Sequence, residues 1–500
     1  MKSTMQDVPL TVGRILRHAV AVHPSAEVVT ATADGVRTAT VAQVGERSAR
    51  LANALRSLGV VADQRVATFM RNNQEHLEAY LAVPAMGAVL HTLNIRLSAE
   101  QLVFIVAHAD DRVLLVDGSL VEVLAPAIER MKSLEHVLVV QADEAGMRRL
   151  QGHHFDVHDY DTLLATASTA FDWPALDELD AAAMCYTSGT TGDPKGVVYS
   201  HRSIYLHSMA CAMGDALGIT TYDRVMPVVP MFHANAWGLP YAAMLVGASL
   251  VLPDRFTSGA DLVHLIESAH PTITAGVPTV WSDVIAHVRA HGGDLGSLRF
   301  VLGGGAPVSV GLQRAMQEVC GVRLIHAWGM TETSPVALVS WPPVEESHPD
   351  HWAYRAKQGR LLNLVEGRVV GEDGTVLPRD GRSVGELEVR GPYVTAGYYR
   401  VDATDRIRDG WLRTEDLGTI DERGFVTLTD RAKDIIKSGG EWISSVDLET
   451  AIAGHPAVRE AAVVGIPDER WQERPLAVVA LHEGEQVSPD ELRAYLAGSF

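Results

Sequence analysis

The sequence predicts an α/β protein with a large N-terminal domain of mixed α/β subdomains, a β-rich subdomain and a small α+β C-terminal domain. Three observations support this prediction. Helical and strand patterns alternate through the first half of the chain, which is typical of parallel sheets covered by helices. After about Ser340, short strand patterns and glycine-rich turns follow one another. A further change near Asp430 leads into a small domain, so we expect domains at residues 1–430 and 431–500.

The elements of the first half follow in a regular order. Residues 46–60 have apolar residues at helical spacing and end at a glycine, the usual stop signal of a helix. Residues 64–70 are expected to form a buried strand, and residues 73–93 a helix followed by a strand. The other strands of this part are expected within 111–118, 135–141, 271–281 and 297–308.

One apolar stretch requires a test for a membrane span. Residues 225–253 contain no Asp, Glu, Lys or Arg, but prolines, His233 and Asn235 interrupt them. A spanning helix needs about 20 mostly apolar residues whose backbone groups bond within the helix. The stretch therefore predicts a buried strand, a loop and a helix, and we expect no integral membrane segment.

The end of the chain predicts short strands and helices. Residues 367–399 are expected to form strands joined by glycine-rich turns. Ser488 and Glu491 have the spacing of a capping box at the start of a helix. Because the sequence stops close to this helix, we expect the C-terminal domain to be truncated. Before it, a helix is expected at 444–456 and strands at 457–468 and 474–484.

The composition excludes several classes of protein. Apolar residues make up 47% and charged residues 21% of the chain, as in ordinary globular proteins. A formal charge of −20 disfavours a broad nucleic-acid surface, which needs clustered Lys and Arg, but it does not exclude a small anionic ligand. The 3 scattered cysteines do not fit a disulfide framework or a Cys-based zinc site. Without a signal-peptide pattern, we expect a cytoplasmic location.

The stretch YTSGTTGDPKG, residues 186–196, has the residue types of a phosphate-binding loop. Such a glycine-rich segment packs poorly and loses much entropy on ordering, so it needs a reason other than core formation. Its backbone N–H groups can cradle an anion, its hydroxyls can add donors or face a metal ion, and Lys195 adds charge. Its order of residues differs from that of a Walker A loop. A mobile surface turn is the alternative interpretation.

The loop resembles the AMP-binding signature of the adenylate-forming enzymes, which include acyl-CoA synthetases, luciferases and peptide-synthetase adenylation domains. Further segments match this family in order, and the resemblance covers nearly the whole chain. Two of the segments, MFHANAWGLPY and SGGEWISSVDLE, look most like those of bacterial fatty-acyl-CoA synthetases and methylmercaptopropionate-CoA ligases. The segments are PMFHANAWGLPY (230–241), GGGAPV (303–308), AWGMTETSP (327–335), GWLRTEDLG (410–418) and DRAKDIIKSGGEWISSVDLE (430–449).

The resemblance implies a reaction in two steps that uses ATP, Mg²⁺ and coenzyme A. A carboxylate attacks the α-phosphate of ATP to give an acyl adenylate and pyrophosphate, and the thiol of coenzyme A then displaces AMP. The first step depends mainly on charge neutralisation and in-line positioning. The resemblance places the β- and γ-phosphates on Thr187, Ser188, Gly189, Thr190, Thr191, Gly192 and Lys195.

The motif TET is implied to bind the metal. Glu332 would bind Mg²⁺, a cation that prefers oxygen ligands, with Thr187 or Thr191 nearby. Thr331 would contact the α-phosphate. Together, the residues that the resemblance implies in catalysis are Lys195, Thr331, Glu332, Lys433 and Lys437.

The adenosine half of the nucleotide is implied to lie against other motifs. Trp328 stands where the family usually stacks an aromatic residue, often Tyr, against adenine, and a core tryptophan is the alternative. Asp416 has the acceptor chemistry for both ribose hydroxyls, and Arg431 would add a donor. The remaining implied nucleotide contacts are Gly304, Gly305, Ala306, Ala327, Gly329, Met330 and Lys437.

The segment around His233 is implied to shape the acyl channel, together with Ala234, Trp237 and Gly238. A satisfied buried histidine is the alternative for His233. The missing side chains of Gly276, Gly304 and Gly329 would leave room for the chain beside the reacting carboxylate.

The segment after residue 430 is implied to serve the second step. Asp430 matches the family hinge about which the C-terminal domain swings between the two reactions, and such gating brings different donors to one carbonyl. Lys433 and Lys437 supply charge near the nucleotide. A charged linker with a glycine-capped helix end is the alternative. Coenzyme A or acyl contacts are implied for Ser438, Gly439, Gly440, Glu441, Trp442 and, less directly, Glu473 and Arg474.

The chain departs from the family at one point. The family has an adenylation lysine near its C-terminus, and here Lys437 is the last lysine of the sequence. We expect a fatty-acid–CoA ligase for medium to long chains. Ligation of an aromatic or short thioether acid, an adenylation-impaired binder of nucleotide or acyl adenylate, and a carrier-loading adenylation domain remain alternatives, and a homodimer is left open.

Overall fold

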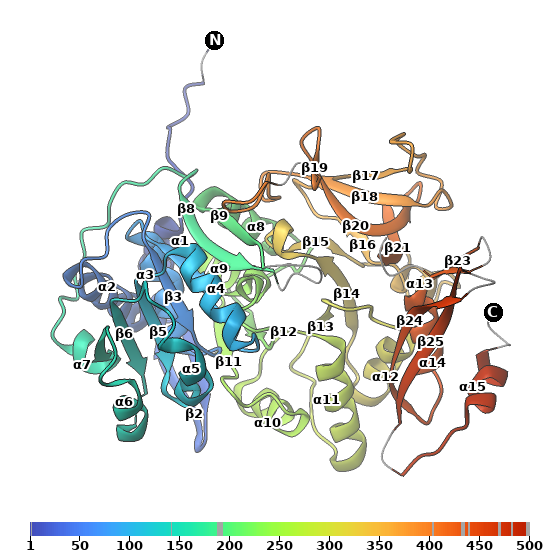
Figure 1. Ribbon diagram of the computed structural model, residues 1–500, viewed down its shortest axis with the longest axis horizontal. Coiled ribbons are helices and arrows are strands. Elements are labelled where there is room, and N and C mark those ends of the chain that lie inside the picture. The colour runs from blue at the N-terminus through green and yellow to red at the C-terminus, as the bar shows by residue number, and fades with distance from the viewer. Residues whose placement is uncertain are drawn as a thin grey trace.

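The structure is a computed structural model that describes residue 1 and residues 3–141, 143–187, 194–402, 405–431, 436–438, 441–468, 472–481 and 484–496. Within these residues the strands form three sheets, with helices packed around them (Figure 1).

The first sheet is parallel except at one edge, where β8 and β9 pair antiparallel. Helices α4 (Ala99–Ala109) and α5 (Val121–Ile128) pack with its strands in one apolar cluster. The short helices α6 (Glu144–Leu150) and α7 (Tyr160–Ala165) follow the last two parallel strands. The strand order is β7 (Asp156–Asp159), β6 (His136–Val140), β5 (Val113–Asp117), β3 (Arg65–Phe69), β4 (Val89–Thr92), β8 (Ala181–Tyr186) and β9 (Gly196–Ser200).

The second sheet begins with a parallel half. Its helices α10 (Gly259–Ala269), α11 (Pro278–His291) and α12 (Val310–Cys320) share an apolar cluster with its strands. The hairpin partner β2 (Gly35–Thr40) closes one edge. The parallel strands, in order from that edge, are β1 (Glu27–Thr32), β11 (Ser249–Leu252), β10 (Arg224–Pro227), β12 (Ile273–Gly276), β13 (Phe300–Gly303) and β14 (Leu324–Gly329).

The same sheet continues past β14 as the antiparallel, β-rich subdomain that the sequence predicts. Its own apolar cluster includes Leu338, Leu387 and Val426. The short helix α13 (His351–Arg355) precedes its second strand. The order continues with β15 (Val336–Val339), β16 (Gly359–Leu361), β21 (Phe425–Arg431), β20 (Trp411–Ile420), β18 (Gly385–Arg390) and β17 (Glu366–Val370), and β19 (Ile407–Arg408) pairs with β20.

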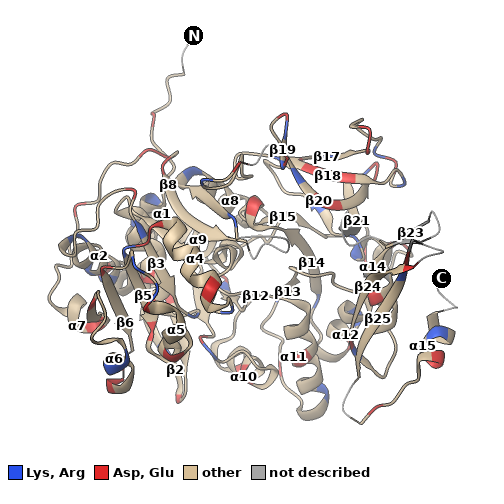
Figure 2. Cartoon of the chain, in the orientation of Figure 1, with Lys and Arg blue, Asp and Glu red and all other residues tan. Residues whose placement is uncertain are grey.

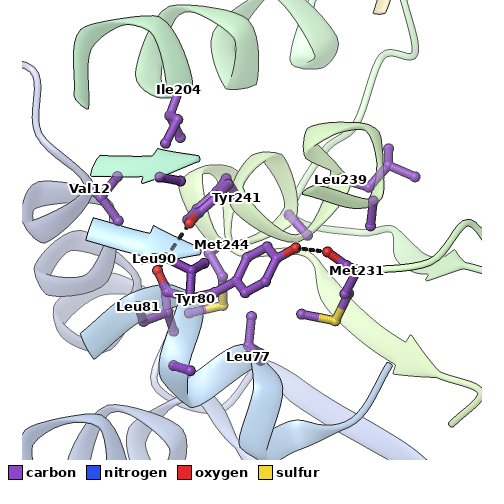
Figure 3. Packing of buried hydrophobic residues seen from close by; sticks show 14 of the residues in the cluster. Val12, Leu77, Tyr80, Leu81, Leu90, Ile204, Met231, Leu239, Tyr241 and Met244 are labelled. Atoms are coloured by element: carbon purple, nitrogen blue, oxygen red, sulfur yellow. Dashed lines mark hydrogen bonds between the residues drawn. The ribbon is translucent and has the colours of Figure 1, made fainter. Parts of the chain in front are cut away.

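The largest core cluster lies among helices that contact both parallel sheets. Helix α3 (Gln74–Ala85) is buried along its whole length, and Tyr80 stacks on Tyr241 with ring centres 5.2 Å apart (Figure 3). Its buried Glu78 accepts hydrogen bonds from Arg47 and Tyr160, each at 2.6 Å, so the charge inside the core is paired. The helices of this cluster are α1 (Val12–Val22), α2 (Val41–Ser57), α3, α7, α8 (His201–Ala212) and α9 (Leu239–Val246).

The C-terminal strands form a separate antiparallel sheet. β21 ends at Arg431 in the large sheet, and β22 begins at Ile436 in the small one. Helix α15 (Pro489–Leu496) starts with the predicted capping box, because Ser488 and Glu491 exchange hydrogen bonds. The sheet order is β23 (Glu441–Ile443), β22 (Ile436–Ser438), β25 (Gln472–Leu481) and β24 (Val458–Asp468), with α14 (Ser445–Ala453) packed on β24.

The predicted fold class is confirmed. The structure begins the first long helix earlier than expected, at Val41, because Thr40 and Gln43 form a capping box there. The stretch 225–253 forms a strand, a loop, a helix and a strand, and no helix in the described part of the chain is long and apolar enough to span a membrane. Figure 2 shows acidic and basic residues interspersed over the outer helices and turns.

Candidate functional site

The hairpin of β8 and β9 holds the predicted phosphate loop at the end of a parallel strand. Tyr186 pairs with Gly196, and the backbone N–H of Thr187 donates to the carbonyl of Lys195 at 2.9 Å. The base of the loop is therefore closed by ladder hydrogen bonds. Ser188, Gly189, Thr190, Thr191 and Gly192 lie outside the described residues.

Glu332 and Lys195 meet at Tyr398. The hydroxyl of Tyr398 donates to Oε1 of Glu332 at 2.6 Å, and Nζ of Lys195 lies 5.2 Å from the centre of the Tyr398 ring. Glu332 sits in the short 3₁₀ turn Thr331–Thr333 and is 5% exposed. The carbonyl of Thr331 accepts from the hydroxyl of Tyr199 in β9 at 2.7 Å. The structure thus brings the TET motif next to the base of the phosphate loop.

Glu332 fits a magnesium ligand. Its Oε2 has no hydrogen-bond partner among the described residues. No group of three or more His, Cys, Asp and Glu side chains in that part of the chain could hold a metal ion by itself. Mg²⁺ at nucleotides usually takes one or two carboxylates together with phosphate oxygens and water, so a single carboxylate has the chemistry for this role.

Trp328 and Asp416, the two predicted adenosine contacts, are joined directly. Nε1 of Trp328 donates to Oδ2 of Asp416 at 2.9 Å, and Trp328 is half-buried. Asp416 and Arg431 face each other in the register of β20 and β21. The structure therefore places an aromatic face and a carboxylate side by side at the edge of the β-rich subdomain.

The glycines predicted to leave room for an acyl chain lie close to other protein atoms. A Cβ on Gly276 would lie 2.7 Å from the Trp281 ring, and one on Gly329 would lie 2.0 Å from the Pro335 carbonyl oxygen. A Cβ on Gly304 would lie 2.6 Å from the carbonyl oxygen of Ala327. A side chain at any of these positions would therefore collide with protein atoms, and room for an acyl chain beside the glycines stays a prediction.

The segment around His233, which is predicted to shape the acyl channel, contains a left-handed turn. Residues 234–238 all have positive φ, between 42° and 74°, and each non-glycine residue in this conformation costs about 1–2 kcal/mol. The turn directs the indole of Trp237 at the glycine loop after β13, since a Cβ on Gly304 would lie 3.1 Å from its Cη2. His233 is half-buried, and burial together with Arg96 lowers its pKa.

Buried polar side chains that the sequence analysis missed hold the segment that leads into this turn. Nδ2 of Asn72 donates to the carbonyls of Pro227 and Val229 at 2.8 and 2.9 Å, and its Oδ1 accepts from the backbone of Met231 at 2.7 Å. The hydroxyl of Tyr80 donates to the Met231 carbonyl (Figure 3). In the sequence, the polar residues Asn72 and Asn73 follow the strand at 65–69 after two positions, and this pair was the available signal.

Most of the predicted residues of the C-terminal part are placed only by their backbone, or lie outside the described residues. Asp430 and Arg431 end β21, whereas Lys437 and Ser438 pair with Trp442 and Glu441 between β22 and β23. Glu473 lies against Gly465, where a Cβ would be 3.3 Å from its Oε2, and Arg474 pairs with Ile466. Lys433, Gly439 and Gly440 lie outside the described residues.

Buried histidines around the site predict acid sensitivity. Burial lowers the pKa of His207, which accepts a hydrogen bond from the Val336 backbone, from 6.5 to about 4. The unfolded chain therefore binds more protons than the folded one, and this contribution to stability is lost as the pH falls from 6.5 towards 4. Denaturant titrations at several pH values measure the free energy of unfolding. In this window its slope against pH should be smaller in His207→Gln than in the wild type, by up to about 1.4 kcal/mol per pH unit. An unchanged slope would contradict the prediction.

The sequence was compared with models of known protein families, and two of them match. The AMP-binding enzyme family matches residues 16–399, and the C-terminal domain of AMP-binding enzymes matches residues 447–500. The chain belongs to the AMP-binding enzyme family. The adenylate-forming resemblance is thereby confirmed, and the enzyme class is an AMP-forming acyl-CoA ligase.

The similarity to individual members of the family covers nearly the whole chain. It is 42% identical over 507 residues to the 3-methylmercaptopropionyl-CoA ligase of Ruegeria lacuscaerulensis, covering 100% of this chain and 93% of that protein. It is 44% identical over 501 residues to the long-chain-fatty-acid–CoA ligase of Thermus thermophilus, covering 99% and 90%. The crystal structure of ATP-bound MatB from Rhodopseudomonas palustris matches with a TM-score of 0.82, 27% identity and coverage of 98% and 92%.

Proposed function

We propose that this acyl-CoA ligase activates a fatty acid of medium to long chain through an acyl adenylate, with Mg²⁺-ATP and coenzyme A as its other substrates. The observation that supports it most is the meeting of Lys195, Tyr398 and Glu332 beside the phosphate loop. The long-chain-fatty-acid–CoA ligase of Thermus thermophilus, at 44% identity, supports the acid.

In the proposed first step, a carboxylate oxygen of the acid bonds to the α-phosphorus of ATP while the bond to pyrophosphate breaks. Lys195 and the hydroxyls of the loop would neutralise and orient the phosphates, and Glu332 would hold the Mg²⁺ ion, which spreads the developing charge when bound. Trp328 and Asp416 would hold adenine and ribose. The positioning of these groups before reaction is what lowers the barrier.

In the proposed second step, the thiol of coenzyme A bonds to the acyl carbon and AMP leaves. We place the hinge at Asp430, because the chain passes from the large sheet to the small one between Arg431 and Ile436. Rotation there would bring the coenzyme A contacts of the C-terminal part, residues 438–442 and Glu473, towards the adenylate.

The acyl channel is proposed to be apolar, which makes chain length the variable to test. Each methylene group that leaves water contributes about 0.8 kcal/mol, close to fourfold in affinity. We expect kcat/KM to rise steeply from butyrate to octanoate or palmitate when AMP and thioester are measured with coenzyme A present. Benzoate and 3-methylmercaptopropionate are assayed in the same way as alternative substrates.

The competing acid has its own support, because the Ruegeria lacuscaerulensis relative is named for 3-methylmercaptopropionate at 42% identity. A kcat/KM for the thioether acid or for benzoate above that of every fatty acid would contradict the proposed substrate. Failure of all acids would contradict the proposed reaction.

A further inference from the structure

Residues 393–399 connect the two halves of the proposed nucleotide site. The backbone N–H of Thr395 donates to the carbonyl of Glu332 at 2.8 Å. At the other end, the backbone N–H of Tyr399 donates to the carbonyl of Gly196 at 2.8 Å. The 393–399 segment is thereby tied both to the TET motif and to the base of the phosphate loop.

Tyr398 lies between these two anchors and contacts both charged residues. Its hydroxyl donates to Glu332, and its ring faces the ammonium group of Lys195. A donor to a carboxylate forms a charge-assisted hydrogen bond, and an aromatic face attracts a cation. Tyr398 is 9% exposed, so water competes little for either contact.

The hydrogen bond from Tyr398 leaves one oxygen of Glu332 available. The Tyr398 hydroxyl donates to Oε1 of Glu332 at 2.6 Å and so occupies one oxygen of this side chain. Oε2 of Glu332 has no hydrogen-bond partner in the described part of the chain.

We propose that Tyr398 is a positioning residue of the Mg²⁺-ATP site, which fixes the Glu332 carboxylate through its hydroxyl and holds Lys195 against its ring. This inference rests on the proposed function, because it assigns Tyr398 a role towards a metal ligand. Hydrogen-bond partners of metal ligands orient them, and their removal typically costs 10–100-fold in metal affinity. Tyr398 acts here through Glu332 and Lys195, and it is not assigned a contact with substrate.

The chain offers a matched control in the same segment. The hydroxyl of Tyr393 donates to the carbonyl of Asn363 at 2.7 Å, and its ring lies on His207, away from Lys195 and Glu332. Tyr398→Phe and Tyr393→Phe each remove one buried hydrogen bond and keep the ring. Similar shifts in melting temperature are therefore expected for both variants, and stability alone cannot separate them.

The test measures ATP binding and ATP–pyrophosphate exchange as a function of Mg²⁺ concentration. We expect Tyr398→Phe to raise the half-saturating Mg²⁺ concentration at least tenfold, and Tyr393→Phe to change it less than twofold. In a Glu332→Gln background, adding Tyr398→Phe should change ATP binding less than twofold, because the carboxylate on which it acts is gone.

The outcomes separate this inference from the proposed function. If the ATP affinity of the wild-type protein did not change with Mg²⁺ concentration, the proposed metal site and the inference would both be contradicted. A wild-type protein that responds to Mg²⁺ would overturn the inference alone if Tyr398→Phe kept the wild-type response or Tyr393→Phe matched its loss. An equal loss from Tyr398→Phe with and without Glu332→Gln would also overturn it.

Discussion

Glu332→Gln is expected to lower the rate of ATP–pyrophosphate exchange by about 10²–10³-fold, the effect typical of removing one preorganised electrostatic group. Glu332 is 5% exposed and accepts a hydrogen bond from Tyr398, whose ring faces Lys195. Glutamine has nearly the same shape and keeps an oxygen that accepts from the Tyr398 hydroxyl. The change therefore removes the negative charge that would bind Mg²⁺ with little effect on packing. Steady-state exchange at saturating acid measures the loss.

Glu366→Gln is the matched control for this prediction. Glu366 forms an exposed ion pair with Arg390 at 2.7 Å on the β-rich subdomain. Such pairs contribute little, so exchange should stay within twofold of the wild type. Exchange by Glu332→Gln within threefold of the wild type, with ATP saturating, would rule out a metal-binding role for Glu332.

Asn72→Ala is expected to lower the free energy of unfolding by about 3 kcal/mol, because it leaves buried carbonyls and an N–H without partners at about 1–3 kcal/mol each. Asn72 is 4% exposed and bonds to Pro227, Val229 and Met231, which lead into the left-handed turn. Since that turn is strained, loss of its anchor should also raise the KM for the acid more than the KM for ATP. Urea titration and initial rates measure the two effects.

Asn53→Ala provides the comparison. The amide of Asn53 donates to the carbonyls of Ala49, Ser168 and Ala170 between 2.9 and 3.1 Å, but it is only half-buried, so water can replace it. We expect a loss below about 1 kcal/mol and unchanged KM values. If the two variants lowered the free energy of unfolding equally, the prediction that the buried Asn72 contributes more than the half-buried Asn53 would be contradicted.

Local patterns in the sequence were enough to predict the strands and helices of the first half. The apolar run at 64–70 and the capping pair Ser488 and Glu491 depend on near neighbours, and both appear in the structure as predicted. The left-handed turn at 234–238 could not be predicted in this way. Only Gly238 in it is a glycine, and the segment that leads into it is held by a residue far away in the sequence, Asn72.

Sequence motifs predicted which residues approach one another, but not what joins them. TET and the phosphate loop meet at Tyr398, which is 66 positions from Glu332 and belongs to no motif considered in the sequence. The hydrogen bond from Trp328 to Asp416 joins two motifs whose proximity the resemblance had implied. Sequence alone cannot show what fills the space beside a glycine, and at Gly276 and Gly329 protein atoms lie where a side chain would extend.

The most direct test is a crystal structure with a non-hydrolysable ATP analogue and Mn²⁺ as an anomalous stand-in for Mg²⁺. We predict an anomalous peak about 2.0–2.3 Å from a carboxylate oxygen of Glu332, with the triphosphate between that residue and the loop that ends at Lys195. A nucleotide bound elsewhere, or a metal ion beyond the reach of Glu332, would contradict the account.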